Sequence, residues 1–320
     1  MKDRLTMFKL VFVLTSLFAL TSQAQTVPPW SKGLNDPAAN RGFVFEVPDI
    51  DNVPDLHGNP VGAKLVLFIG GNQFFVLPKL ISGFEKLHPE LAGHIFYETL
   101  PPGVLLKQMA HGNRVTLGNL TIGIAPDIYE AGARELEKLQ KDGRVEKVVP
   151  YTTNDLEIMV QSGNPMHIAS LKDLARENVR ASMPNPEYEG VANQIIASLK
   201  KTGGEELATQ VYQSRVATGG VFLTQIHHRQ TPMRILKNES DVGVVWTSEV
   251  IFQQKIGNRI EGVEIPPSEN TTAVYAAGLV TNASHRSAAV AWLEYLQSDQ
   301  AQAAYREFGF KSVTTHQGHE

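Results

Sequence analysis

The stretch that most constrains the fold is Tyr275–Phe310, because it holds a strand and two helices with clear boundaries. An apolar strand, Ala276–Val280, precedes two helices whose apolar residues recur at i, i+3, i+4 and i+7. Ser298 is suited to cap the second helix and Gly309 to end it. The apolar positions, which we expect to face a core, are Ala289, Trp292, Leu293, Leu296, Ala301, Ala304, Tyr305 and Phe308.

Apolar runs and helical patterns alternate along most of the remaining chain. We expect strands at 64–69, 95–99, 120–125, 156–160, 179–183 and 242–246, with helices between them, including one at 128–140. Such alternation with short connections predicts an α/β fold with mixed, mostly parallel sheets. Because 320 residues exceed one usual hydrophobic core, we expect two Rossmann-like lobes, the second inserted into the first, joined by a two-crossover hinge.

The first residues have the pattern of a secretory signal peptide. Three basic residues precede the apolar run 10–20, and small residues lead to an expected cleavage site after Ala24. The run is too short for a membrane span, which needs roughly 20 residues. We therefore expect a signal peptide at 1–24 and a periplasmic protein, with a Pro-rich extension at 25–62 and a polar tail at 314–320.

Composition excludes several classes of function. The chain has no cysteine, which removes disulfides, thiolate metal sites, cysteine nucleophiles and the lipid attachment point of a lipoprotein. Its 29 basic and 33 acidic side chains provide no basic face for nucleic acid or an anionic membrane. Phosphate-loop, nucleophile-elbow and zinc-protease motifs are missing from the sequence, so we expect no enzyme, no cofactor and no metal.

Several motifs together resemble the molybdate- and tungstate-binding branch of type II periplasmic solute-binding proteins. Besides the C-terminal stretch, they are Lys64–Gln73, Gly163–Leu174, Val179–Gly190 and Asn238–Glu249, which occur in the order of that family. The resemblance implies lobe 1 at 63–155 and 264–313, and lobe 2 at 156–263. It also implies a monomeric substrate-binding protein of an ABC importer that binds a small, anionic solute between the lobes and docks to an inner-membrane permease.

The resemblance also places the ligand contacts of the family on this chain. The two hydroxyl groups with which the family contacts its ligand fall on Asn72 with Gln73 and on Gly103. The tyrosine that contacts the ligand in the family falls on Trp246. A small residue in its third loop falls on Glu189, before Gly190, and a backbone contact falls close to His228. Most of these positions lack the hydroxyl groups of the family, which indicates a different solute. Asn72 could instead be a plain helix cap, and Trp246 could fill the core.

The pentapeptide His227–Thr231 precedes Pro232, a residue suited to the first turn of a helix, so we expect it at a helix N-terminus. Arg229 is then a bidentate donor to a carboxylate or oxyanion and His228 a second donor, unless the segment is an ordinary solvated loop. A bare carboxylate at Glu189 would repel an anion. It must therefore pair with Arg229, be protonated or face a cationic ligand, unless it points to solvent.

A second function stays open at this point. The altered positions and the extension 25–62 also suit a periplasmic sensor or accessory protein that docks to a receptor or an enzyme instead of a permease.

Overall fold

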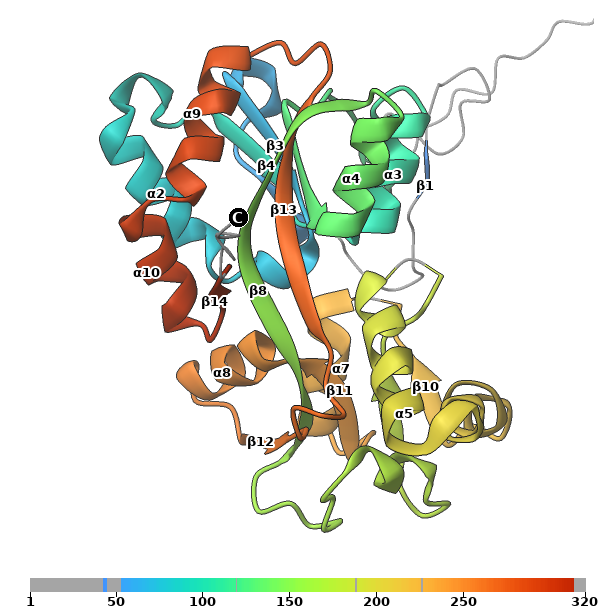
Figure 1. Cartoon of the computed structure of the whole chain (residues 1–320). Coiled ribbons are helices and arrows are strands. Elements are labelled where there is room, and N and C mark those ends of the chain that lie inside the picture. The colour runs from blue at the N-terminus through green and yellow to red at the C-terminus, as the bar shows by residue number, and fades with distance from the viewer. Residues whose placement is uncertain (1–42, 45–52, 119, 188, 226, 314–320) are drawn as a thin grey trace, which may run out of the picture.

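The computed structural model describes residues 43–44, 53–118, 120–187, 189–225 and 227–313 (Figure 1). The expected signal peptide 1–24, most of the extension 25–62 and the tail 314–320 lie outside these residues. Within the described chain, no helix combines the length and the apolar character that crossing a membrane requires.

Two sheets are present among the described residues. The larger one has eleven strands: β2 (Leu56–His57), β3 (Leu65–Ile69), β4 (Ile95–Glu98), β7 (Ile128–Gly132), β8 (Val145–Gln161), β9 (Ala181–Met183), β10 (Val221–Leu223), β11 (Val242–Trp246), β12 (Ile260–Glu264), β13 (Thr272–Val280) and β14 (Lys311–Ser312). Their order is β10-β9-β11-β8-β13-β7-β3-β4-β2, with β12 and β14 also paired to β8. The smaller sheet contains β1 (Phe43–Val44), β5 (Arg114–Leu117) and β6 (Leu120–Gly123).

Helices cover both faces of the larger sheet. They are α2 (Leu77–Leu87), α3 (Pro102–Ala110), α4 (Ala133–Lys141), α5 (Gly190–Thr209), α6 (Arg215–Ala217), α7 (His227–Leu236), α8 (Thr247–Lys255), α9 (Arg286–Leu296) and α10 (Asp299–Glu307). In lobe 1, α2, α9 and α10 lie on one side and α3 and α4 on the other (Figure 1). The mixed α/β fold is therefore confirmed, with parallel pairing among β7, β3 and β4 and among β11, β9 and β10.

The long strand β8 belongs to both halves of the molecule. Its residues Val145–Asp155 pair with β13, and Leu156–Gln161 pair with β11 and β12. Figure 1 shows β8 and β13 running side by side from one half to the other. The parallel strands β7, β3 and β4 lie in one half, and β11, β9 and β10 in the other. We call the half with β7, β3 and β4 lobe 1 and the half with β11, β9 and β10 lobe 2.

Several local expectations are confirmed. Ser298 caps α10 by accepting a hydrogen bond from the backbone N–H of Ala301, and the positive φ of Gly309 follows the end of that helix. The strand β11 has the expected bounds. In α9 and α10, Trp292, Leu293, Leu296, Ala301, Ala304 and Tyr305 are buried as predicted.

Three expectations were wrong. Residues 128–132 form a strand, and the helix begins only at Ala133, because β7 is buried between β3 and β13 and a fully buried strand lacks the alternation that identifies one. Residues 120–123 pair with β5 in a hairpin of the smaller sheet instead of joining the main sheet. Pro232 lies inside α7 instead of in its first turn, because the helix already begins at His227; the pentapeptide is at the helix N-terminus, as expected.

A buried chain of hydrogen bonds ties the first loop of lobe 1 to the C-terminal helices. Glu130 accepts hydrogen bonds from Trp292 Nε1 at 2.7 Å and from the Tyr151 hydroxyl at 2.8 Å. The amide of Gln73 donates to that Tyr151 hydroxyl and accepts from the hydroxyl of Tyr305. All five side chains are buried. These hydrogen bonds therefore hold the short 3-10 helix η4 (Gly71–Gln73) in a fixed position against β7, β8, α9 and α10.

The two lobes also meet outside the hinge strands. Phe252 of α8 stacks on Phe75 at 4.9 Å and meets Phe74 edge-on at 5.1 Å, both ring-centroid distances. Elsewhere, Arg229 Nη2 of α7 lies 2.9 Å from Oδ2 of Asp55, which ends the 3-10 helix η2 (Val53–Asp55). Asp55 is fully buried and accepts hydrogen bonds from the backbone N–H and the hydroxyl of Thr99, which follows β4. The ion pair therefore joins lobe 2 to lobe 1.

Buried carboxyl groups should make stability fall as pH rises. Burial raises the pKa of Glu98 and of Glu249 to about 8, and that of Glu130 and of Glu189 to about 7. The folded chain therefore binds more protons than the unfolded chain between about pH 4.5 and pH 8. We expect the free energy of unfolding in urea to be on the order of a few kcal/mol lower at pH 8.5 than at pH 5.5.

Glu98→Gln should make this pH dependence shallower, and Glu177→Gln, a change at an exposed carboxylate, should leave it unchanged. Equal slopes for the two variants would contradict the assignment of a raised pKa to Glu98.

The Asp55–Arg229 pair gives a second stability test. Arg229→Met leaves a buried carboxylate without this partner and should cost about 2 to 4 kcal/mol in urea unfolding. Asp55→Asn should cost less, because Arg229 is partly exposed and can turn to water. In the Asp55→Asn background, Arg229→Met should then cost less than about 1 kcal/mol, whereas additive costs would show that the pair contributes nothing.

Candidate functional site

A cavity of about 710 Å³ lies between segments of both lobes and the hinge. Lobe 1 contributes residues at the starts of η4, α3 and α4, and lobe 2 contributes residues at the starts of α5 and α8 and in α7. The hinge strand β13 contributes residues 272–275. The cavity therefore occupies the place where ligands bind in α/β proteins, at the carboxyl ends of the parallel strands.

Four helices begin at the wall of the cavity. The N-cap residues of α3, α4, α5 and α8 all line it, and they are Pro101, Gly132, Glu189 and Trp246. None of these four N-caps forms a side-chain hydrogen bond to its own helix. A helix N-terminus has backbone N–H groups without intrahelical partners and the positive end of the helix dipole. The cavity wall therefore offers donors and positive partial charge from both lobes.

A chain of polar contacts crosses the hinge at the cavity. Asn72 in η4 donates from Nδ2 to the hydroxyl of Tyr275 on β13, at 2.7 Å. Asn154 of β8 lies close enough to lower the pKa of this hydroxyl, and its Nδ2 donates to Ser248 Oγ in α8 at 2.8 Å. Burial raises the pKa of Tyr275, so its hydroxyl stays protonated. These contacts connect one wall of the cavity to the other through the hinge strands.

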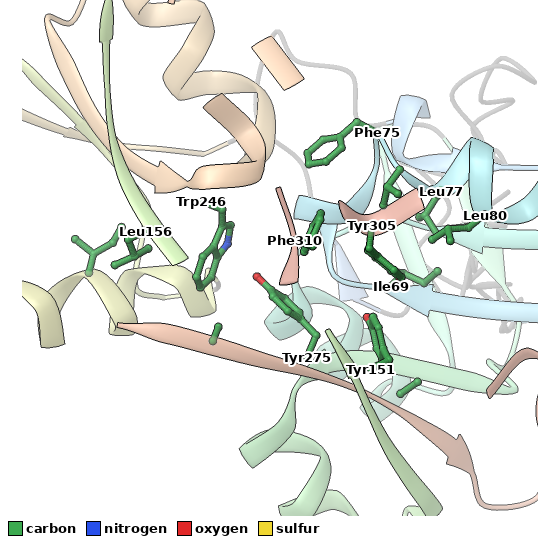
Figure 2. Packing of buried hydrophobic residues seen from close by; sticks show 14 of the residues in the cluster. Ile69, Phe75, Leu77, Leu80, Tyr151, Leu156, Trp246, Tyr275, Tyr305 and Phe310 are labelled. Carbon is green, nitrogen blue, oxygen red and sulfur yellow. The ribbon is translucent and has the colours of Figure 1, made fainter. Parts of the chain in front are cut away.

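Trp246 and Tyr275 form the aromatic part of the wall. Their ring centroids are 5.8 Å apart in an edge-on arrangement, and Figure 2 shows the two side chains facing each other. Both also belong to the main hydrophobic core, so the two interpretations of Trp246, ligand contact and core packing, are compatible. Trp246 is 8% and Tyr275 5% exposed, so only a small part of each side chain reaches the cavity.

Two buried carboxyl groups line the lobe 2 side. Glu189, the N-cap of α5, accepts hydrogen bonds at Oε1 from the backbone N–H of Asn185 and the hydroxyl of Thr224. Glu249, in the first turn of α8, accepts at Oε1 from Gln253 Nε2 at 3.0 Å. They are only 6% and 4% exposed, and burial raises the pKa of Glu189 to about 7 and that of Glu249 to about 8.

The lobe 1 side has a different balance of charge. Arg134, in the first turn of α4, is the one basic side chain among the described residues that line the cavity. Its neighbours Glu135 and Glu137 also line the cavity, and Glu135 accepts a hydrogen bond from the Tyr129 hydroxyl. Burial raises the pKa of Glu135 above its usual value. No group of His, Asp and Glu side chains suited to a metal ion occurs among the described residues.

The predicted site residues divide into two groups. Asn72, Glu189, Gly190 and Trp246 line the cavity. Gln73 instead takes part in the buried hydrogen bonds around Glu130. Gly103 does not line the cavity, but its neighbour Pro102 does. Arg229 lies in the ion pair with Asp55 and does not line the cavity. His228 lies in the first turn of α7, and its side chain is outside the described part of the chain.

Sequence reasoning missed Tyr275, Glu249 and Arg134. Tyr275 is the first residue of the C-terminal stretch, and the expected strand began one residue after it. Glu249 closes the motif Asn238–Glu249, which was used only for the resemblance. Thr231, at the end of the pentapeptide, also lines the cavity. Its position depends on the close approach of α7 to β11, because a side chain at Gly243 would collide with Thr231.

Comparisons with known proteins agree with this geometry. The profile of the family described as bacterial extracellular solute-binding protein matches residues 65–311. The "Putative ABC transporter substrate-binding lipoprotein YvgL" of Bacillus subtilis (strain 168) is 23% identical over 236 residues, which are 73% of this chain and 81% of YvgL.

Solved structures share the fold. The sulfate-binding protein SubI of Mycobacterium tuberculosis H37Rv has a TM-score of 0.64 at 17% identity, covering 78% of this chain and 87% of SubI. The periplasmic molybdate-binding protein of Azotobacter vinelandii has a TM-score of 0.61 at 15% identity, covering 77% and 98% of the two chains. With the profile match over 65–311, the chain belongs to the bacterial extracellular solute-binding proteins.

Proposed function

We propose that the chain is the periplasmic substrate-binding protein of an ABC-type importer, and that it closes its lobes on a small anionic solute. The observation that carries this proposal is the convergence of four uncapped helix N-termini on one cavity from both lobes. An anion bound there gains hydrogen bonds and a favourable dipole interaction from each lobe. Such a ligand stabilises the closed arrangement more than the open one.

The hinge in this proposal is the pair β8 and β13, with lobe 1 at 63–155 and 264–313 and lobe 2 at 156–263. Backbone hydrogen bonds hold the two strands together along their shared length, so a change in their twist moves one lobe against the other. The contact between Phe252 and Phe75 lies outside these strands and would change with the angle between the lobes. The closed form is the one presented to the permease.

The comparisons support the anionic solute and the transport role. YvgL is named for ABC transport, and two structural neighbours are named for sulfate and molybdate, which are both anions. The basic residues and apolar run before Ala24 support export to the periplasm. Among the predicted contacts, Asn72, Glu189, Gly190 and Trp246 line the cavity, and Gly103 adjoins a lining residue. The proposal places the solute against these residues, in a monomeric protein.

Ligand binding should raise the melting temperature and change the fluorescence of Trp246. Anions at about 100 times their Kd should add about 2.7 kcal/mol of stability, because only the folded chain binds them. The fluorescence change should disappear in Trp246→Phe and persist in Trp292→Phe, because Trp292 is buried against Glu130 and does not line the cavity. Scanning calorimetry and fluorescence titration with sulfate, molybdate and organic phosphates and carboxylates measure both effects. Unchanged melting temperatures across this panel would contradict the proposal.

Gly190 allows a matched pair of variants. No atom lies within 4 Å of a Cβ added there, so Gly190→Asp and Gly190→Ala should both fold. Gly190→Asp places a carboxylate at the first residue of α5, where it interacts favourably with the helix but competes with an anionic ligand. In isothermal titration calorimetry, Gly190→Asp should weaken anion binding about tenfold or more, and Gly190→Ala by much less. Equal affinities in the two variants would place the anion away from α5.

A further inference from the structure

The cavity is large for a bare oxyanion. Its volume of about 710 Å³ lies within the range of roughly 300 to 1,000 Å³ that is usual for organic ligands. A tetrahedral oxyanion is comparable in size to a few water molecules, each of which takes about 30 Å³. The rings of Trp246 and Tyr275 and the proline residues Pro101, Pro184 and Pro232 provide apolar surface along the wall. Such a wall suits a ligand with carbon atoms.

Two carboxyl groups on the lobe 2 side each have an oxygen to offer. The hydrogen bonds of Glu189 with described residues all end on Oε1, and so does the bond that Glu249 receives from Gln253. Oε2 of each group therefore has no hydrogen-bond partner among the described residues. Neither Oε2 atom is among the side-chain atoms that are buried without a partner, and both residues line the cavity, so each Oε2 can accept a hydrogen bond from a ligand.

Among the described residues, no arginine forms a salt bridge with Glu189 or Glu249. Arg229, the sequence-predicted partner of Glu189, is in the ion pair with Asp55 and does not line the cavity. Arg134, which does line it, begins α4 on the lobe 1 side. The two sides of the cavity thus differ in what they offer. Lobe 1 has helix N-termini, the cation Arg134 and the carboxyl groups of Glu135 and Glu137, whereas lobe 2 has helix N-termini and the two buried carboxyl groups without a basic side chain among the described lining residues.

We propose that the solute is an organic anion that also carries a hydroxyl or ammonium group, and that Glu189 and Glu249 accept hydrogen bonds from that group. This inference rests on the proposed function and specifies the chemical class of its solute. The anionic end lies at the N-termini of α3 and α4 beside Arg134 and Asn72, and the carbon body lies against Trp246. The donor end lies against α5 and α8. A fully deprotonated oxyanion such as sulfate or molybdate has no hydrogen to give to the two carboxyl oxygens and fits the site less well.

Matched ligands test the donor group directly. Propyl phosphate, glycerol 3-phosphate and O-phosphoethanolamine share a phosphate and differ in having no added donor, hydroxyls or an ammonium group. Propionate, lactate and alanine repeat the comparison with a carboxylate. Isothermal titration calorimetry should find, in at least one set, a hydroxyl or ammonium member that binds about tenfold or more tightly than the member without donors. Within each set, comparing the affinity of the hydroxyl member with that of the ammonium member shows which donor the site prefers.

Variants then assign the effect to the carboxyl groups. Glu189→Gln should reduce the preference for the donor-bearing ligand by about tenfold, and Glu187→Gln, at an exposed carboxylate in the same loop, should leave it unchanged. Glu249→Gln is the second variant if Glu189→Gln does not fold by circular dichroism. If the carboxyl groups act instead as protonated donors to a bare oxyanion, Glu189→Gln keeps a donor and should retain binding of molybdate or sulfate.

Three results would overturn the inference. They are tighter binding of molybdate or sulfate than of every organic probe, an unchanged preference in both glutamine variants, and no binding of any probe. The first leaves the proposed function intact, because an anion still binds between the lobes. The second also leaves it intact and removes only the role of the two carboxyl groups. The third counts against the proposed function as well.

Discussion

The pairing of β8 with β13 is the constraint on which the rest of the structure depends. A single strand of 17 residues first pairs with β13 and then, from Leu156 onward, with β11 and β12, so the backbone hydrogen bonds of both lobes share one strand. The parallel strands of the larger sheet are ordered outward from this pair, β7, β3 and β4 in lobe 1 and β11, β9 and β10 in lobe 2. The carboxyl ends of the two parallel groups consequently meet at one cavity, together with the helices that follow them.

This arrangement explains why the cavity combines donors with buried acids. Each parallel strand that ends at the cavity is followed by a helix or a 3-10 turn, so uncapped N–H groups accumulate there independently of the side chains. The side chains then differentiate the walls. Asn72 and Arg134 lie on the lobe 1 side, Glu189 and Glu249 lie on the lobe 2 side, and Tyr275 on the hinge hydrogen-bonds to Asn72. The hydrogen bonds of Asn72 with Tyr275 and of Asn154 with Ser248 connect these walls to the hinge strands.

The sequence predicted the fold well where local signals agree with tertiary packing. The cap at Ser298, the strand Val242–Trp246 and the apolar faces of α9 and α10 are examples, because periodicity and capping are local properties. It failed at Ile128–Gly132, where burial on both faces removes the alternation that marks a strand. The site was harder to predict. Asn72, Glu189, Gly190 and Trp246 were placed in the cavity by resemblance, but the partner of Arg229 is Asp55, from a segment 174 residues away that carries no local signal of the contact.

The most direct test of the central claim, that one cavity binds a solute from both lobes, is a crystal structure with the tightest-binding anion from calorimetry. The account predicts ligand density between Trp246 and Asn72, with its anionic group at the N-termini of α3 and α4 and hydrogen bonds to lobe 2 residues at the starts of α5 or α8. Density outside the cavity, or contacts from one lobe alone, would contradict it.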